Sequence, residues 1–350
     1  MPRPAKGGFP ACTLPPAVTA AEMQPGFARA DFSSRGDVDV GRHIQSALHP
    51  AGPHAEAVAS LSWLLFYAAA AILVIVVALA AYALWAPPER RAWVADRRFV
   101  VAAGIVFPVT ALAALLAYTL AVARSIVSSA EPPAVRIEVI GHQWWWRVHY
   151  LNERGEVDFE TANEIRLPTG TAVEIALKSA DVIHSFWVPN LAGKLDMVPG
   201  RVNRLRVHAA RAGVYRGQCA EYCGGPHAKM AFYAVAEEPQ AFARWRDAQR
   251  RAAASVDDAP AGLGRALVLK HCAACHTVRG TGANGRLGPD LTHVGSRLTL
   301  AAGILPNNPG TIASWVSASQ QIKPGNLMPS MSVFSGDELR AVAAYLHALQ

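Results

Sequence analysis

The chain has 350 residues and a formal net charge of +7, a length that allows two or three domains of ordinary size. Hydrophobic residues make up 52% of it and the mean hydropathy is +0.17, which is high for a purely soluble protein and low for a many-span transporter. The lysines and arginines are scattered and form no polybasic run, so the charge does not indicate a nucleic-acid partner. Five cysteines in a chain this long exclude a small disulfide-stabilised scaffold.

The N-terminal segment is rich in proline, alanine and glycine and contains no apolar core of signal-peptide length. We expect residues 1–45 to form a poorly ordered leader. Cys12 lies in this leader and stays unassigned, because no apolar segment precedes it as a lipid-attachment site would require.

Two charge-free stretches follow, one from Ala57 to Pro88 and one from Phe99 to Ala123. Each exceeds the roughly 20 residues that a membrane-spanning helix needs. They predict a transmembrane hairpin over residues 57–127, with spans at about 61–86 and 99–123. The short charged loop between them disfavours the alternative of two buried core helices. Pro108 in the second span is tolerable, since neighbouring helices can satisfy the freed backbone group.

The loop from Pro87 to Arg98 contains four arginines. Cytoplasmic loops carry an excess of lysine and arginine, so we place this loop in the cytoplasm. Both termini, and everything after the second span, then lie on the periplasmic side. The sequence thus predicts a multi-pass protein of a bacterial inner membrane, in contact with lipid.

After the second span the hydrophobic pattern changes to short alternating or β-branched runs separated by turn signals. This pattern predicts a small antiparallel β-sandwich or barrel over about residues 131–240. The expected strands are Val135–Ile140, Val173–Leu177, Val202–Val207 and Gly213–Tyr215, and the expected turns are Asn152–Gly155 and Pro168–Gly170.

The last loop of this domain brings four soft donors together within twelve residues: Cys219, Cys223, His227 and Met230. Such a set selects copper over magnesium or calcium. A mononuclear blue-copper site uses one cysteine, so the second thiolate is in excess for one metal, whereas two thiolates that bridge two copper ions would both be used. A second histidine must come from elsewhere, and His184 is the best candidate.

Two other interpretations of the cysteine pair stay open at this point. Cys219 and Cys223 could form a disulfide in an oxidising compartment. They could also belong to a structural zinc site, which the methionine disfavours because thioethers are poor zinc ligands.

The motif Cys-x-Glu-x-Cys-x3-His-x2-Met, with His-Ser-Phe upstream at 184–186, resembles the copper A motif of cytochrome c oxidase subunit II. The resemblance covers about residues 45–240 and includes Gly141-His-Gln-Trp-Trp-Trp and Asp196-Met-Val-Pro-Gly-Arg-Val-Asn. It implies a dinuclear copper A centre. The ligands it implies are His184, Cys219, Cys223, His227, Met230 and the backbone carbonyl of Glu221.

The same resemblance implies further roles. The Glu221 side chain would join a magnesium site shared with subunit I, and Trp144 matches the aromatic residue through which the family receives electrons. Trp145 and Trp146 are better interpreted as packing residues. Many family members carry a glutamate near the start of the second span, at the mouth of a proton path; this chain has none there, and Asp96 is a weak substitute.

A stretch rich in arginine, alanine and aspartate at about residues 241–260 predicts a linker. Beyond it stands Cys272-Ala-Ala-Cys275-His276, the C-x-x-C-H signature of covalently attached haem c. The two thiols add to the haem vinyl groups and the histidine supplies an axial nitrogen. A C-x-x-C pair alone can also be redox-active or metal-binding. The helical patterns at Gly264–Lys270 and Gly336–Leu349 favour haem.

Residues 261–350 resemble a class I cytochrome c, which implies an all-α domain. Met328, before Pro329, fits the family's sixth haem ligand, and Met331 is the alternative. Gly288-Pro289-Asp-Leu is similar to the segment that braces the axial histidine. Arg297 and Trp315 lie where the family contacts the haem propionates.

The sequence therefore predicts a multidomain membrane protein: a two-helix transmembrane hairpin, then a cupredoxin-like all-β sandwich, then an all-α cytochrome c domain. By resemblance it is a subunit of a haem–copper cytochrome c oxidase. Electrons would pass from a donor such as cytochrome c or the bc1 complex to its own haem, then to copper A, and then to subunit I. Oxygen is reduced to water there, with proton translocation. Subunits I and III are the implied partners.

Three other functions are disfavoured. A nitrous oxide reductase needs a large histidine-rich domain, a copper carrier would rarely hold both copper A ligands and covalent haem, and quinol oxidase subunit II lacks the copper ligands.

Residues 261–350 hold seven lysines and arginines against three acidic residues, whereas residues 153–164 are acidic. One hypothesis is that the basic tail docks on this acidic stretch; the alternative is that both are solvated faces. The acidic residues are Glu153, Glu156, Asp158, Glu160 and Glu164.

Overall fold

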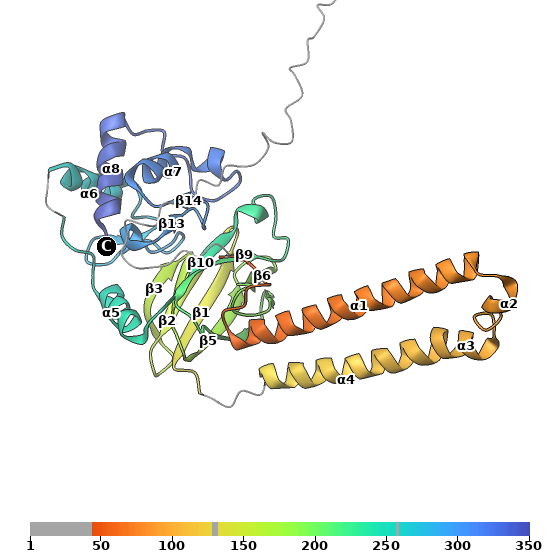
Figure 1. Ribbon diagram of the computed structural model, residues 1–350. Coiled ribbons are helices and arrows are strands. Elements are labelled where there is room, and N and C mark those ends of the chain that lie inside the picture. The colour runs from red at the N-terminus through yellow and green to blue at the C-terminus, as the bar shows by residue number, and fades with distance from the viewer. Residues whose placement is uncertain (1–43, 128–131, 257–258) are drawn as a thin grey trace, which may run out of the picture.

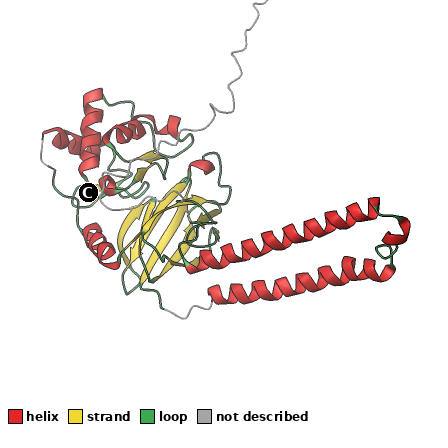
Figure 2. Cartoon of the chain, viewed as in Figure 1, coloured by secondary structure: helices red, strands yellow, loops and turns green. Residues whose placement is uncertain are grey.

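The computed structural model describes residues 44–127, 132–256 and 259–350 (Figure 1). A hairpin of long helices leads into a β-sandwich, and a helical unit follows at the C-terminal end (Figure 2). This order of parts confirms the expected fold class. Apart from its last two residues, the expected leader, with Cys12, lies outside the described residues.

The hairpin consists of helix α1 (Pro53–Trp85) and a second helical rod from Arg97 to Val127. Both are long and apolar enough to cross a membrane, and their most apolar windows are not buried against the rest of the protein. The rod is built from α3 (Arg97–Val101), the π-turn η1 (Ala102–Val106) and α4 (Phe107–Val127), and the loop before it holds α2 (Pro88–Arg91).

The π-turn accounts for how the rod accommodates Pro108. Proline has no backbone N–H, and its ring crowds the carbonyl four residues earlier. In the turn before it, the N–H of Phe107 donates to the carbonyl of Ala102, five residues back, so the helix is wider there. The helix therefore adjusts within its own backbone, whereas the sequence pointed to neighbouring helices.

The β-sandwich contains two sheets of five strands among the described residues. The first sheet has the strand order β3-β2-β1-β5-β8, and the second has the order β4-β10-β9-β6-β7. The strands of the first sheet are β1 (Val135–His142), β2 (Trp145–Leu151), β3 (Val157–Ala162), β5 (Ala172–Ser179) and β8 (Asn203–His208). Those of the second are β4 (Glu164–Pro168), β6 (His184–Trp187), β7 (Leu195–Met197), β9 (Gly213–Cys219) and β10 (Ala231–Glu237).

The expectation of a purely antiparallel sandwich is wrong at two strand pairs. Strand β1 runs parallel to β5, and β4 runs parallel to β10. Parallel neighbours need a long connection between them. The chain supplies one by building strands β2, β3 and β4 between β1 and β5, with β4 placed in the opposite sheet.

An aromatic cluster fills the sandwich beneath the end of β6. The Trp146 ring meets Phe186 and Phe232 edge-on, at centroid distances of 6.0 and 5.1 Å, and the two phenylalanines stack at 4.6 Å. All three side chains are at most 1% exposed. Close-packed interiors of this kind resist local movement, so the strand ends above them are held in place.

Half of the segment expected to be a linker is helical. Helix α5 (Pro239–Arg250) packs two aromatic side chains, Phe242 and Trp245, against Tyr150 of β2. Trp245 also lies 5.6 Å from Phe159 of β3. The arginine-rich composition concealed this face, in which Phe242 and Trp245 extend the sandwich core while Arg244 and Asp247 of α5 are exposed.

The C-terminal unit consists of α6 (Ala259–His271), α7 (Pro309–Ile322) and α8 (Gly336–Ala348) around a small apolar core. Helices α6 and α8 cross at Gly264, where an added Cβ would lie 2.1 Å from the Ala341 carbonyl oxygen. The short strands of this unit are β11 (Thr277–Val278), β12 (Ala283–Asn284), β13 (Thr299–Leu300) and β14 (Leu305–Pro306).

This crossing gives a matched pair of glycine substitutions in α6. Gly264→Ala should destabilise the C-terminal unit by about 1–3 kcal/mol, because the new methyl group overpacks the contact with α8. Gly262→Ala should leave its stability unchanged or slightly raised, since nothing lies within 4 Å of that Cβ position and alanine favours helix. Hydrogen exchange of α6 and α8 amides in the full chain measures both. Equal protection in the two variants would contradict the described crossing.

Candidate functional site

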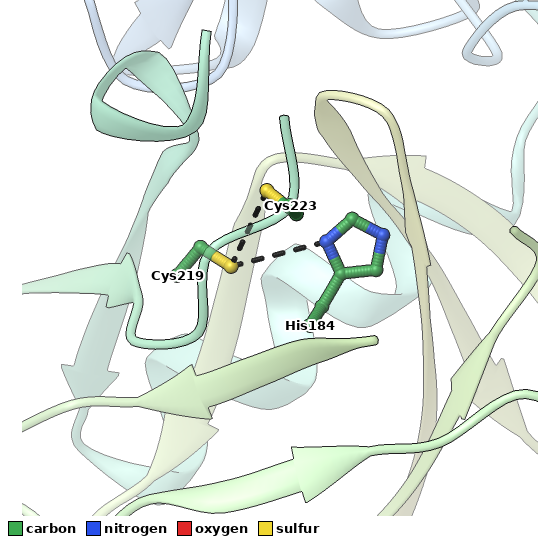
Figure 3. A group of neighbouring side chains, drawn as sticks. All are labelled: His184, Cys219 and Cys223. Atoms are coloured by element: carbon green, nitrogen blue, oxygen red, sulfur yellow. Dashed lines mark hydrogen bonds between the residues drawn. The ribbon is translucent and has the colours of Figure 1, made fainter. Parts of the chain in front are cut away.

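The donor residues of the cysteine loop meet at one end of the second sheet. Cys219 is the last residue of β9 and His184 the first of β6, and these strands pair with Phe186 opposite Cys219. The loop then carries Cys223 and His227 before Met230 leads into β10. Strand pairing thus brings His184 across 35 residues of sequence to the cysteines (Figure 3).

The distances among the donor atoms are those of a compact metal centre. The two cysteine Sγ atoms lie 3.8 Å apart and are not joined by a disulfide bond. Cys219 Sγ lies 3.8 Å from Nδ1 of His184 and 3.2 Å from the carbonyl oxygen of Glu221. Cys223 Sγ lies 3.4 Å from Nδ1 of His227 and 3.8 Å from Sδ of Met230. Metal–thiolate bonds are about 2.3 Å long, so these spacings suit atoms that share ligated metal.

The arrangement fits two soft metal ions better than one. The thiols lie in the middle, and each has a separate imidazole and a separate weak donor beside it. A single ion would leave part of this set unused. Two ions bridged by both sulfurs would use all of it. The donor chemistry therefore agrees with a dinuclear copper centre, and the methionine does not suit structural zinc.

Burial and hydrogen bonding prepare the thiols to bind metal. Cys219 and Cys223 are 1% and 2% exposed, and His184 and Met230 are completely buried. The hydrogen bond between the two thiols lowers the pKa of Cys219 and outweighs burial, and the same bond together with burial raises the pKa of Cys223. Since the thiolate is the metal-binding form, Cys219 is ready to coordinate at neutral pH.

Asp181, which the sequence reasoning missed, orients His184. The His184 Nε2–H donates to Asp181 Oδ1 at 2.8 Å, which turns Nδ1 toward the thiols. The other carboxylate oxygen accepts the Gln143 N–H at 2.7 Å. Burial would raise the pKa of Asp181, but these hydrogen bonds outweigh it and hold the pKa below its usual range. The signal in the sequence was an acidic residue three positions before a candidate metal-binding histidine.

Trp144 lies directly against the cysteine loop. Its indole Nε1–H donates to the carbonyl oxygen of Cys223 at 2.8 Å, and the Gln143 side-chain amide donates to the same oxygen at 2.7 Å. Gly224 makes room for the indole, since a Cβ there would lie 2.9 Å from the Trp144 ring. Trp146 is a buried core residue, as expected. The half-buried Trp145 stacks on His142.

The C-x-x-C-H run follows α6 and forms the first turn after it. His276 Nδ1–H donates to the Pro289 carbonyl at 2.8 Å, which leaves Nε2 available to a haem iron. Gly288 packs flat on the imidazole, because a Cβ there would lie 2.5 Å from its Cε1. Burial lowers the pKa of His276, which keeps the ring neutral. Cys272 and Cys275 are free and half-buried. These features fit covalent attachment of haem c.

Both candidate methionines lie at the edge of the core of the C-terminal unit. The Met328 N–H donates to Asn326 Oδ1, and its carbonyl accepts from Ser319 and Gln320, so its backbone is fixed on both sides. The Met331 N–H donates to the carbonyl of Val316. Arg297 is buried, with its guanidinium donating to the Asp290 carbonyl, and Trp315 is half-buried on α7.

The acidic stretch of the sandwich meets the C-terminal unit at Glu164 and Glu160. Glu164 Oε2 accepts the backbone N–H of Leu298 at 2.7 Å, and Glu160 accepts a backbone hydrogen bond from Asp290. Asp158 pairs with Arg250 of α5, and Glu160 pairs with Arg147 and His149 of β2. Burial lowers the pKa of Arg297 in the C-terminal unit, and the charges of Asp290, Glu164 and Glu160 oppose this effect, so the acidic stretch also acts on one basic side chain of the tail.

Comparison with known families divides the chain in the same way. Residues 151–236 match the model of the cytochrome c oxidase subunit II periplasmic domain, and residues 261–350 match that of cytochrome c. The first range contains the donor residues His184, Cys219, Glu221, Cys223, His227 and Met230. The second contains the C-x-x-C-H run at 272–276 and the candidate haem ligands Met328 and Met331.

Two relatives, both named cytochrome c oxidase subunit 2, align with more than half of the chain. It is 37% identical over 217 residues to cytochrome c oxidase subunit 2 of Alkalihalophilus pseudofirmus, covering 62% of this chain and 61% of that protein. It is 30% identical over 227 residues to cytochrome c oxidase subunit 2 of Bacillus sp., covering 62% of each. The match thus spans about three fifths of these relatives.

A solved structure is similar to a smaller part of the chain. The periplasmic domain of subunit II of cytochrome oxidase from Bradyrhizobium japonicum is 30% identical. The similarity covers 34% of this chain and 96% of that one, with a TM-score of 0.32.

Asp181→Asn tests whether this carboxylate orients His184. The amide keeps the size of the side chain but loses the charge that fixes the imidazole, so copper affinity should fall about tenfold or more. Copper titration of the full chain against a competing chelator measures the change. Asp247→Asn, on the exposed side of α5, removes the same charge elsewhere and should bind copper as the parent does. Unchanged affinity in Asp181→Asn would contradict the role.

Proposed function

Because residues 151–236 belong to the subunit II periplasmic-domain family of cytochrome c oxidase and residues 261–350 to the cytochrome c family, we propose that this chain is the electron-accepting subunit of a haem–copper cytochrome c oxidase. The observation that carries the proposal is the convergence of two thiols, two imidazoles, a thioether and a carbonyl, each within 3.8 Å of a cysteine sulfur.

In this proposal, electrons pass from an external donor to haem c, then to the copper pair, and then to subunit I, where oxygen is reduced with proton translocation. The copper pair supplies a one-electron carrier whose charge is shared over two metals. The proposed copper ligands are His184, Cys219, the Glu221 carbonyl, Cys223, His227 and Met230. The proposed haem ligands and attachment residues are Cys272, Cys275, His276 and Met328.

The chain's own residues make this transfer efficient by holding the donors still. One hydrogen bond joins the indole of Trp144 to the Cys223 carbonyl. Asp181 fixes the imidazole of His184, and the Pro289 carbonyl fixes that of His276. Ligands that do not move on oxidation or reduction lower the reorganisation that each electron transfer requires.

Two long apolar helices and a domain of a periplasmic family indicate a membrane protein with a periplasmic domain. We extend this to a multi-pass protein of a bacterial inner membrane with both termini in the periplasm. Its proposed partners are oxidase subunits I and III and a donor such as cytochrome c or the bc1 complex. Glu221 would add its side chain to a magnesium site at the subunit I interface. The proposed division is a leader (1–45), hairpin (57–127), copper domain (131–240), linker (241–260) and haem domain (261–350).

Cys223→Ser tests the copper centre. The parent should bind two coppers per chain and, when oxidised, give an electron paramagnetic resonance spectrum of one electron shared by two coppers. The serine variant should lose this spectrum, because a hydroxyl cannot replace a bridging thiolate. Cys272→Ser, a matched control in the other domain, should keep the copper spectrum and lose one thioether bond to haem. A Cys223→Ser spectrum identical to the parent's would overturn the assignment.

A pair of leucine variants decides the sixth haem ligand. Met328→Leu should abolish the sulfur-to-iron charge-transfer absorption and lower the haem potential, because a histidine–methionine pair raises it. Met331→Leu should preserve both properties. Optical spectroscopy and redox titration of the full chain measure the outcome, and the reverse pattern would assign the ligand to Met331.

A further inference from the structure

The cytochrome c domain rests on the same loop that carries the copper donors. Backbone contacts join the two domains: the N–H of Ala231, next to Met230, donates to the Ala302 carbonyl at 3.0 Å. At the edge of this contact the Arg147 guanidinium donates to the Arg286 carbonyl at 2.6 Å. The interface therefore lies directly over the copper loop.

Two lysines cross this interface in opposite directions. Lys323, just after α7 of the cytochrome c domain, donates to the Trp144 carbonyl at 2.5 Å and to the Ala301 carbonyl at 3.1 Å. Lys229, in the turn between His227 and Met230, donates to the Ile322 carbonyl at 2.5 Å. Each domain thus contributes one lysine that donates to a backbone carbonyl of the other domain: Lys323 to Trp144 and Lys229 to Ile322.

Both lysines occupy positions where carbonyl oxygens require a hydrogen-bond donor. The last carbonyls of a helix have no partner within the helix and carry a partial negative charge. The Ile322 carbonyl at the end of α7 is one of these, and Lys229 satisfies it. Lys323 is only 2% exposed, which is rare for a lysine without specific acceptors. Burial lowers the pKa of Lys323 to about 7, and either form of the amine can donate to its two carbonyls.

The segment held by these lysines packs against one edge of the aromatic ring of Trp144. At Gly325, a Cβ would lie 3.6 Å from Cη2 of the Trp144 ring, so the backbone there packs on the indole. Met328, the proposed haem ligand, follows three residues later. Trp144 therefore contacts both sides: its carbonyl and ring meet the cytochrome c domain, and its indole N–H bonds to Cys223.

From this geometry we infer that Lys229 and Lys323 form a latch that holds the cytochrome c domain over Trp144, so that the copper centre receives electrons from the chain's own haem and a separate donor protein cannot reach Trp144. The inference rests on the proposed function. Both lysines are positioning residues, since neither amine forms a hydrogen bond with a proposed metal ligand or with a haem attachment residue.

Lys323→Met in the full chain with both cofactors tests the latch. Methionine keeps the length of the side chain but leaves both carbonyls without a donor. After photoreduction of haem, electron transfer to copper should slow on the order of tenfold or more, because small displacements of reacting groups are costly. The rate should also become viscosity-dependent, as expected when the domain must dock again. The copper and haem spectra should stay those of the parent.

Hydroxyl-radical footprinting of Trp144 gives a second readout that does not depend on electron transfer. Lys323→Met should increase modification of Trp144 severalfold. Lys229→Met should act in the same direction and, because Lys229 is exposed, should fold as the parent does. Lys270→Met removes an exposed lysine from α6 of the same domain and should match the parent in both measurements.

The outcomes separate the latch from the proposed function. Parent-like rates and parent-like footprints in both Lys323→Met and Lys229→Met would overturn the latch and leave the proposed function intact. Absence of any haem-to-copper transfer in the fully loaded parent would overturn the proposed function, while the footprints would still report whether the lysines hold the domain.

Discussion

The antiparallel pairing of β6 with β9 is the interaction on which the site depends. It places Phe186 opposite Cys219 and thereby brings His184 to the cysteine loop. A slip of this register by one residue would turn His184 to the other face of the sheet. The donor set would then lose one of its two imidazoles. The metal centre is therefore only as well defined as this short strand pair.

The rest of the sandwich serves to keep that pairing in one register. Below it, Trp146, Phe186 and Phe232 form a closely packed aromatic cluster that leaves little space for movement. Above it, Asp181 connects the β1–β2 turn to His184, and Trp144 connects the same turn to the cysteine loop. The aromatic cluster thus supports the site from below, and hydrogen bonds from residues outside the donor set fix it from above. Such support is expected for a centre that must keep its geometry.

Sequence reasoning was most successful where spacing is local. Four soft donors within residues 219–230 meet in any fold that closes this loop, and the C-x-x-C-H run is equally self-contained. It failed where contacts are long-range: strand directions, the aromatic face of α5, and Lys323. The acceptor of Lys323 is a backbone carbonyl 179 positions away, and a backbone carbonyl leaves no trace in the sequence. Asp181 lies between these cases. It was missed, although its position three residues before His184 was a signal in the sequence.

Helix α5 has a consequence for how far the haem can travel. Because α5 is packed on the sandwich, only the eight residues between its end at Arg250 and the start of α6 at Ala259 can act as a tether. Fully extended, they reach roughly 28 Å. Even these are restrained, since the N–H of Ala253 donates to the Arg279 carbonyl at 2.9 Å. A released haem domain would pivot within one molecular diameter of the copper loop, so recapture would outpace any exchange with a neighbouring complex.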